Sequence, residues 1–188
     1  MRALPIAVSA LTALVATLTL TACDDGGSGD KGGEKADNSA SPARSSAGST
    51  ACKADQVGQE VAASEAPAAG DTGSVSVTLT NRSGADCTLE GFPRVDLTAG
   101  GTSWTLDPEE DAQPEKLTLK ADETTAFTIT YVRGPAGDAN KGAAVTTVKF
   151  GLPGAGVDLS FPWKYGEVAL RSASEPDASV GPLQRAGD

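Results

Sequence analysis

The chain contains no histidine, and its only methionine is Met1. Without histidine, Ser-His-Asp and Cys-His catalytic arrangements cannot exist, and neither can the usual His-containing zinc sites. Copper binding through methionine and histidine ligands is excluded for the same reason. Aromatic residues make up only 4% of the chain, so a folded core has to be built mainly from valine, leucine and alanine.

Basic residues are also scarce, with 15 Lys and Arg against 25 Asp and Glu, for a formal net charge of −10. An acidic surface repels the phosphates of nucleic acids, and no basic stripe with interleaved aromatic residues offsets this repulsion. We therefore expect no nucleic-acid partner. The same charge disfavours binding to anionic lipid headgroups, so attachment to a membrane would have to come from an acyl chain.

Residues 1–22 are typical of an export signal, because an apolar run from residue 3 to residue 22 follows Arg2. The run ends in Leu20-Thr21-Ala22-Cys23, which matches the lipobox of bacterial lipoproteins. In such proteins the cysteine thiol takes a diacylglyceryl group before cleavage. We therefore expect Cys23 to be the lipidated first residue of a mature protein on the outer face of the cytoplasmic membrane. An ordinary cleaved signal peptide and a retained membrane anchor are the alternatives.

Low-complexity segments flank the part of the chain that can fold. Residues 23–50 are rich in Gly and Ser and hold no apolar residue larger than alanine after Cys23, so they are predicted to be a disordered tether. A coil of this length and composition spans roughly 25–30 Å. Residues 174–188 have a similar composition and are predicted to be a flexible tail. This leaves residues 51–173 as one domain.

Apolar residues in this domain recur with a period of two, which predicts half-buried strands. The clearest runs lie at 74–80, 127–131, 148–152 and 157–161, with shorter ones at 95–97, 104–106, 117–119 and 168–170. Turn residues separate them, and Gly100-Gly101 predicts a tight hairpin. The pattern predicts an all-β fold, an immunoglobulin-like antiparallel β-sandwich of about seven to nine strands, in preference to a barrel.

Cys52 and Cys87 remain as an even pair once Cys23 is assigned to the lipid. An exported, oxidising setting favours a disulfide between them. A reactive or metal-binding role for the pair is the alternative, although no histidine is present to assist it.

The segments Asn81-Arg82-Ser83 and Cys87-Thr88-Leu89-Glu90-Gly91-Phe92-Pro93 resemble a signature in a family of actinobacterial lipoproteins that share a domain of unknown function. The resemblance covers about residues 51–160 and implies a β-sandwich in which Cys52 bonds Cys87. It implies no activity. Many members carry a second cysteine pair, which this chain lacks. Within the motif, we expect Asn81 to lie in a turn and Gly91 and Pro93 to bend the chain around a buried Phe92.

An acidic loop is the first candidate site. Residues 107–111 read Asp-Pro-Glu-Glu-Asp, and Glu115 and Asp122 follow. Their oxygens could bind calcium. The alternative is a solvated loop that keeps one end of a sheet soluble, and we expect no metal site because the spacing is not that of an EF-hand.

An aromatic cluster is the second candidate. Alternation places Phe161, Trp163 and Tyr165 on one side of the chain. If this side is exposed, the rings could form a platform for a sugar, a peptide or a partner protein. The preferred alternative is that they close the core.

These features favour a membrane-anchored extracytoplasmic lipoprotein with a non-catalytic domain that binds an envelope protein or glycan. We expect no cofactor and no enzymatic activity. The alternatives are a cell-envelope hydrolase that uses a pair of carboxylates and a passive surface lipoprotein.

Overall fold

The computed structural model describes residues 50–186. The predicted signal peptide, Cys23 and nearly all of the tether lie outside these residues. Within residues 50–186, no helix is long and apolar enough to cross a membrane. The one helical element in this part is the 3-10 turn η1 (Ala54–Gln56).

Strands and the turns and loops between them make up the rest of the described chain. Two-residue and three-residue strands account for six of the sixteen, so ten have the length expected of a half-buried strand. The sixteen strands are β1 (Thr50–Ala51), β2 (Val57–Ser64), β3 (Thr72–Asn81), β4 (Cys87–Glu90), β5 (Arg94–Ala99), β6 (Thr102–Thr105), β7 (Asp107–Pro108), β8 (Lys116–Leu119), β9 (Thr124–Val132), β10 (Gly142–Ala143), β11 (Thr147–Gly151), β12 (Asp158–Pro162), β13 (Val168–Ser172), β14 (Glu175–Pro176), β15 (Ala178–Val180) and β16 (Gln184–Arg185).

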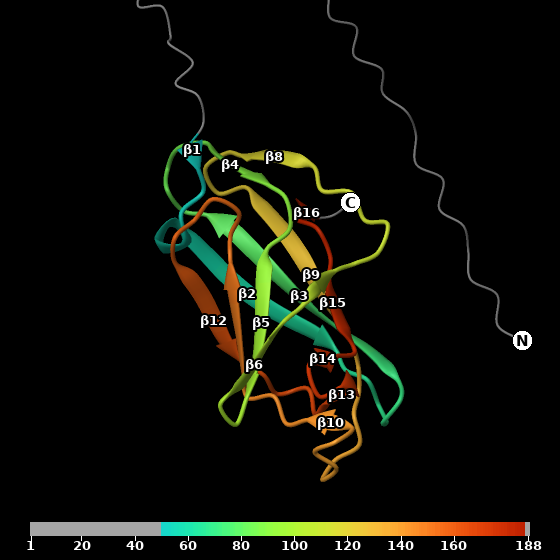
Figure 1. Cartoon of the computed structure of the whole chain (residues 1–188). Helices are drawn as coiled ribbons and strands as arrows, with labels where there is room; N and C mark the ends of the chain where they lie inside the picture. Colours follow the sequence, from blue (N-terminus) through green and yellow to red (C-terminus); the bar gives the residue numbers. More distant parts are fainter. Residues whose placement is uncertain (1–49, 187–188) are drawn as a thin grey trace, which may run out of the picture. The chain divides into compact units, whose positions relative to one another are not determined.

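Two sheets form the sandwich (Figure 1). The larger has the order β2-β3-β9-β15-β7, with β16 also paired to β9, and the other has the order β12-β11-β5-β6. Taken in chain order, β2, β3, β5, β6, β9, β11 and β12 occupy the positions of strands A, B, C, C′, E, F and G of an immunoglobulin domain. The predicted all-β sandwich is therefore confirmed, with more and shorter strands than expected.

The core lies between these sheets and uses the predicted alternation. Phe127 of β9 packs edge-on against Phe150 of β11 across the sandwich, with ring centroids 5.2 Å apart. Alternate residues of β3, β5, β9 and β11 are fully or almost fully buried. The buried members are Val75, Val77, Leu79, Val95, Leu97, Phe127, Ile129, Tyr131, Val148 and Phe150.

The β5–β6 hairpin confirms the predicted turn. Ala99 pairs with Thr102, and Gly100 and Gly101 have φ angles of 53° and 93°. A two-residue hairpin loop with two positive φ angles is the turn whose twist suits antiparallel strands, and glycine adopts it without strain.

The prediction of a flexible tail from residue 174 is wrong for residues 175–185. β15 pairs antiparallel with β9, and β16 pairs with β9 further along. Val180 and Leu183 are each 1% exposed. The strands of this segment are too short to show a period of two, and backbone hydrogen bonds to β9 hold them in place.

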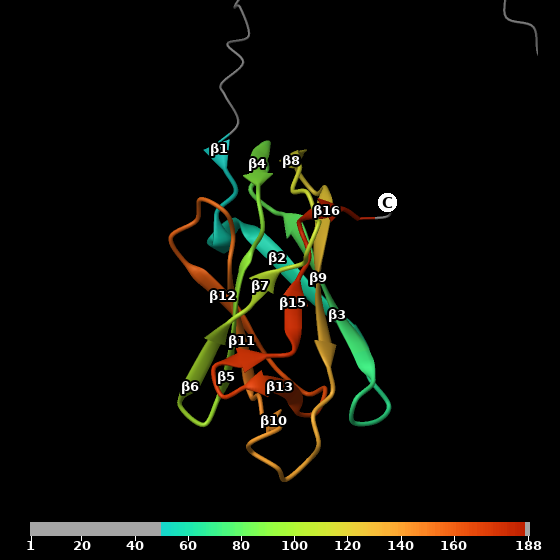
Figure 2. The ribbon, with the colours of Figure 1, turned by 45° about the vertical axis from the view of Figure 1, so that its right-hand side comes forward.

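The two ends of the sandwich differ (Figures 1 and 2). One end carries β1, β4, β8 and β16, and we call it the entry end because the chain enters the domain at β1. The opposite end carries the β5–β6 hairpin, β10 and β13, and we call it the distal end.

Candidate functional site

The predicted aromatic platform is contradicted by burial. Phe161 and Trp163 are 6% and 5% exposed, and Tyr165 is half-buried. The Trp163 ring packs edge-on against Tyr131 and Tyr165 at 4.9 Å. Its Nε1 donates to the carbonyl of Gly166 at 2.7 Å. These rings close the core, which is the alternative interpretation given above.

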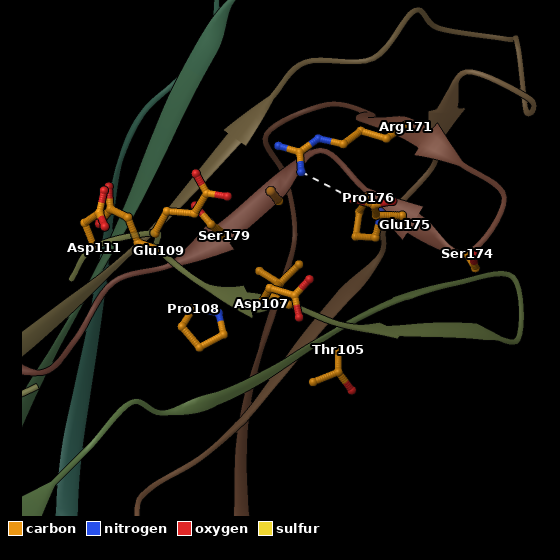
Figure 3. Close-up of a pocket in the computed structure, with 13 residues that line it drawn as sticks. Thr105, Asp107, Pro108, Glu109, Asp111, Arg171, Ser174, Glu175, Pro176 and Ser179 are labelled. Carbon is orange, nitrogen blue, oxygen red and sulfur yellow. Dashed lines mark hydrogen bonds and ion pairs between the residues drawn. The ribbon is translucent and has the colours of Figure 1, made fainter. Parts of the chain in front are cut away.

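The acidic loop lines a groove of about 640 Å³ on the side of the sandwich where β6 and β7 are the edge strands. The groove forms where the chain leaves β6 and crosses to the other sheet, because β7 pairs in parallel with β15. The backbone N–H of Glu109 also donates to the carbonyl of Val180 at 2.8 Å. We call this the acidic groove; its lining includes Asp107, Glu109, Glu110, Asp111, Arg171 and Glu175 (Figure 3).

Arg171 provides the positive charge in the acidic groove. Its guanidinium pairs with Asp177 at 2.7 Å and with Glu175 at 3.4 Å. The hydrogen bond to Asp177, followed by the charge of that carboxylate, raises the pKa of Arg171 above its ordinary value. The carboxylates of Asp107 and Glu109 are exposed, so the groove presents negative charge to the solvent.

The calcium hypothesis gains no support from this geometry. Among residues 50–186, no group of three or more His, Cys, Asp or Glu side chains is placed to hold a metal ion. Glu115 lies apart from the acidic groove and lines a hollow beside Leu183. Asp122 lies in the turn that follows β8.

A second groove was not predicted from the sequence. It has a volume of about 400 Å³ and lies between the β5–β6 hairpin and β10–β13 at the distal end. Trp104 is half-buried in its wall, and its Nε1 donates to the carbonyl of Ala173 at 3.2 Å. We call it the Trp104 groove; its lining is Ala99, Gly100, Thr102, Trp104, Ala139, Asn140, Gly142, Ala143, Ala144, Leu170 and Ala173.

The period-two pattern placed Trp104 and Leu106 together on an inward face. Leu106 is 4% exposed, as this pattern requires, whereas Trp104 is only half-buried. β6 is the edge strand of its sheet, and one side of the Trp104 ring faces the groove beyond it. The sequence signal that could have indicated this groove was the run of small residues at 142–144, because small side chains leave room beside a large ring.

The two grooves are neighbours. Leu170 and Ala173 line the Trp104 groove, while Arg171 and Ser174 line the acidic groove. The β13–β14 hairpin therefore forms a ridge with an apolar hollow on one side and an acidic one on the other. A ligand that crosses this ridge would meet both.

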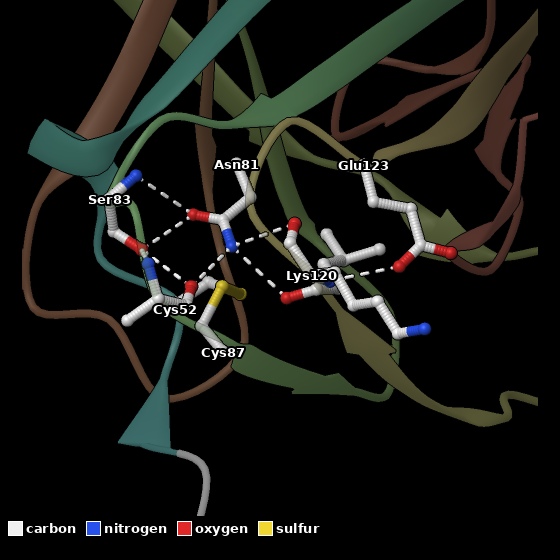
Figure 4. Close-up of a disulfide and its surroundings, with 8 residues drawn as sticks. Cys52, Asn81, Ser83, Cys87, Lys120 and Glu123 are labelled. Carbon is white, nitrogen blue, oxygen red and sulfur yellow. Dashed lines mark hydrogen bonds between the residues drawn. A yellow bond between two sulfur atoms is a disulfide. The ribbon is translucent and has the colours of Figure 1, made fainter.

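The cysteine pair belongs to the entry end of the fold. Cys52 and Cys87 form a disulfide with a Cα–Cα distance of 4.9 Å, which confirms the predicted bond. Beside it lies Asn81, whose side chain is fully buried (Figure 4). Its amide donates to three carbonyls, those of Ala85 at 2.7 Å, Leu119 at 3.0 Å and Lys120 at 3.1 Å.

The acceptor side of Asn81 is satisfied as well. Its Oδ1 accepts from the backbone N–H of Ser83 at 3.0 Å and from the Ser83 hydroxyl at 2.7 Å. Asn81-Arg82-Ser83 is thus a turn, as predicted, and it joins the β3–β4 connection to the β8–β9 connection. The described residues contain no buried side-chain nitrogen or oxygen without a hydrogen-bond partner.

Phe92 departs from its predicted position. The ring is half-buried, whereas the neighbouring Pro93 is buried. Gly91 has a φ of 115°, and this bend carries Phe92 to the wall of a hollow of about 320 Å³ beside the loop that joins β11 to β12. Alternation beyond a bend does not fix the direction of a side chain, which explains the error.

The fold and the disulfide define a disulfide-stabilised domain of immunoglobulin-like topology, with two adjoining grooves on one side of its surface. Residues 52–184 match the family described as a domain of unknown function (DUF4232), and the chain belongs to this family. No curated protein and no solved structure matches the chain.

Proposed function

We propose that the protein is a membrane-anchored extracytoplasmic lipoprotein whose sandwich domain is a non-catalytic binding module. The anchor rests on the lipobox ending in Cys23. The observation that carries the binding role is the Trp104 groove, an apolar hollow at the end of the domain away from the chain entry. Small-molecule and peptide sites are typically concave and lined by apolar and aromatic side chains with a few polar groups.

Trp104 has the features of an anchoring residue for a partner. Tryptophan is enriched among the residues that contribute most to binding energy. The ring is already held by the hydrogen bond to Ala173, so little side-chain freedom is lost on binding. The surrounding alanine and glycine residues leave space for an inserted apolar group.

The acidic groove narrows the class of partner. It lies across the β13–β14 ridge and exposes Asp107, Glu109 and other carboxylates. Complementary charge favours a partner segment with a basic residue near an apolar one. A protein segment of this kind fits both grooves, so we favour an envelope protein over a neutral glycan.

Site-specific photo-crosslinking in intact cells tests this proposal. A photoreactive amino acid replaces Thr102, an exposed residue that lines the Trp104 groove, in the full-length lipoprotein. The matched control position is Thr118, which is also exposed on a strand but lies on β8 at the entry end. We expect one dominant protein to be captured from position 102 and not from position 118.

Two further variants complete the experiment. Trp104→Ala should abolish the capture, because it removes the ring that lines the groove. Cys23→Ala should release the protein from the membrane and lower the capture. Equal capture from positions 102 and 118, or none from either, would contradict the binding module and favour a passive surface lipoprotein.

A further inference from the structure

The entry end carries an apolar projection that the proposed binding site does not use. The loop between β11 and β12, residues 152–157, reads Leu-Pro-Gly-Ala-Gly-Val and has no polar side chain. Val157 is 65% exposed and is the one large hydrophobic side chain exposed among the described residues. Phe92 lies beside this loop, and together they line the hollow of about 320 Å³ described above. Leu152 is buried in the core, so we call Phe92 and residues 153–157 the apolar tip.

The apolar tip lies next to the place where the chain enters the domain. A Cβ added at Gly154 would stand 3.4 Å from the Cβ of Ala51 in β1. Lys53 and Ala54 line a hollow together with residues 154–157. The 27 residues from Cys23 to Ser49 therefore join the domain at the end that carries the tip.

The charges around the apolar tip are nearly balanced, although the chain as a whole is acidic. On one side of the tip, Arg94 pairs with Asp158 at 2.9 Å and with Asp96 at 3.5 Å. Lys53 and Asp55 lie on the other side and line the hollow under Val157. These five side chains carry one net negative charge, so an anionic surface would meet far less repulsion here than at the acidic groove.

On these observations we infer that the apolar tip docks on the lipid bilayer surface. The inference rests on the proposed lipid anchor. A coil of about 27 residues spans roughly 25–30 Å and so confines the domain close to the membrane. Confinement of this kind raises the effective concentration to the millimolar range, at which a weak surface contact becomes populated. When the entry end docks, the tether does not have to pass around the domain to reach the membrane. The Trp104 groove, at the distal end, then faces away from the membrane.

A spin-label depth measurement tests the docking. The chain from residue 24 carries an N-terminal hexahistidine tag and is held on vesicles of phosphatidylglycerol, phosphatidylethanolamine and a nickel-chelating lipid. Because the chain has no histidine, the tag provides the only such attachment. A nitroxide on Gly156→Cys reports the tip, because this position is exposed and an added Cβ there would meet nothing within 4 Å. A nitroxide on Thr102→Cys reports the distal end.

We expect the ratio of oxygen accessibility to chromium-oxalate accessibility at position 156 to rise severalfold on vesicles and to stay constant at position 102. Adding Val157→Asp should return position 156 to its value in solution. A ratio at 156 that equals the one at 102, or that ignores Val157→Asp, would overturn the inference. Spin–spin broadening at 156 without vesicles would also overturn it, because it would assign the tip to a contact between two copies.

The native anchor is assayed separately. The lipoprotein produced in cells and its Cys23→Ala form are compared by vesicle flotation. Equal flotation of the two would refute the lipid anchor of the proposed function and leave the spin-label result unaffected, so the two failures are distinguishable.

Discussion

The buried amide of Asn81 allows a quantitative prediction. The Asn81→Ala change removes the side-chain partner of the Leu119 carbonyl and of the Ser83 backbone N–H. The Ala85 and Lys120 carbonyls keep a partner, because the Ser83 hydroxyl released from Asn81 lies 2.8 Å from the first and the Glu123 N–H donates to the second at 3.1 Å. Each buried backbone group that loses its partner costs about 1 kcal/mol or more, so these two groups should lower the unfolding free energy by about 2 kcal/mol.

The Asn81→Asp change adds a pH signature. It keeps the shape of the side chain but places a carboxylate oxygen, in the position of the amide nitrogen, against three carbonyls. Burial and this arrangement raise the pKa of the new carboxyl above the value of about 3.9 that it has in the unfolded chain. Below a pH of about 3.9 the carboxyl is neutral in both the folded and the unfolded state. The destabilisation should therefore be smallest near pH 4 and grow as the pH rises toward the raised pKa of the folded state.

Urea unfolding measured from pH 4 to pH 8 checks both variants against the wild-type protein. The matched control is Asn140→Asp, which adds the same charge at an exposed position and should change stability by less than about 0.5 kcal/mol. A loss below about 1 kcal/mol for Asn81→Ala, or a pH-independent loss for Asn81→Asp, would refute the described network.

Four other changes test separate parts of the fold. Replacing Cys52 and Cys87 together by alanine should lower stability by about 3–4 kcal/mol, measured by urea unfolding, because the bond closes a loop with a sequence separation of 35. Trp163→Ala should lower it by about 3–5 kcal/mol, as for a core aromatic; an unchanged melting temperature would contradict the core role. Leu183→Asp should prevent cooperative unfolding of the chain in calorimetry, whereas a flexible tail would tolerate it. For Glu123, a hydrogen bond from the Lys120 N–H and, less strongly, pairing with Arg185 lower the pKa. Glu123→Gln should therefore lower the stability of the protein at pH values above the ordinary glutamate pKa. The effect should fade as the pH falls through the lowered pKa of Glu123, and thermal melts at several pH values measure it.

The sequence predicted the centre of the sandwich well. Strands such as β3 and β9 are nine or ten residues long and buried on one side, so their apolar residues must alternate. The same logic cannot reach strands of two or three residues, which complete no repeat. β7, β15 and β16 are of this kind, and backbone hydrogen bonds to other strands define them.

The candidate site was harder to predict, because alternation gives the direction of a side chain and not what lies over it. Trp163 and Trp104 follow the same inward pattern, yet the first is packed between two tyrosines and the second forms a groove wall. The difference arises from their neighbours in space. The acidic loop was identified correctly as polar and solvated, but its groove exists only because the C-terminal strands lie against β7.

The C-terminal segment completes the fold and also builds the site. Without β15 and β16, the side of β9 away from β3 would expose unpaired N–H and C=O groups along a central strand, a form that promotes aggregation. Residues 174–179 also form one wall of the acidic groove. The family match, which runs to residue 184, ends within β16 and so includes these strands. A domain cut at residue 173 would therefore lose its fold and its grooves together, and the binding role has to be tested on the chain with its C-terminus intact.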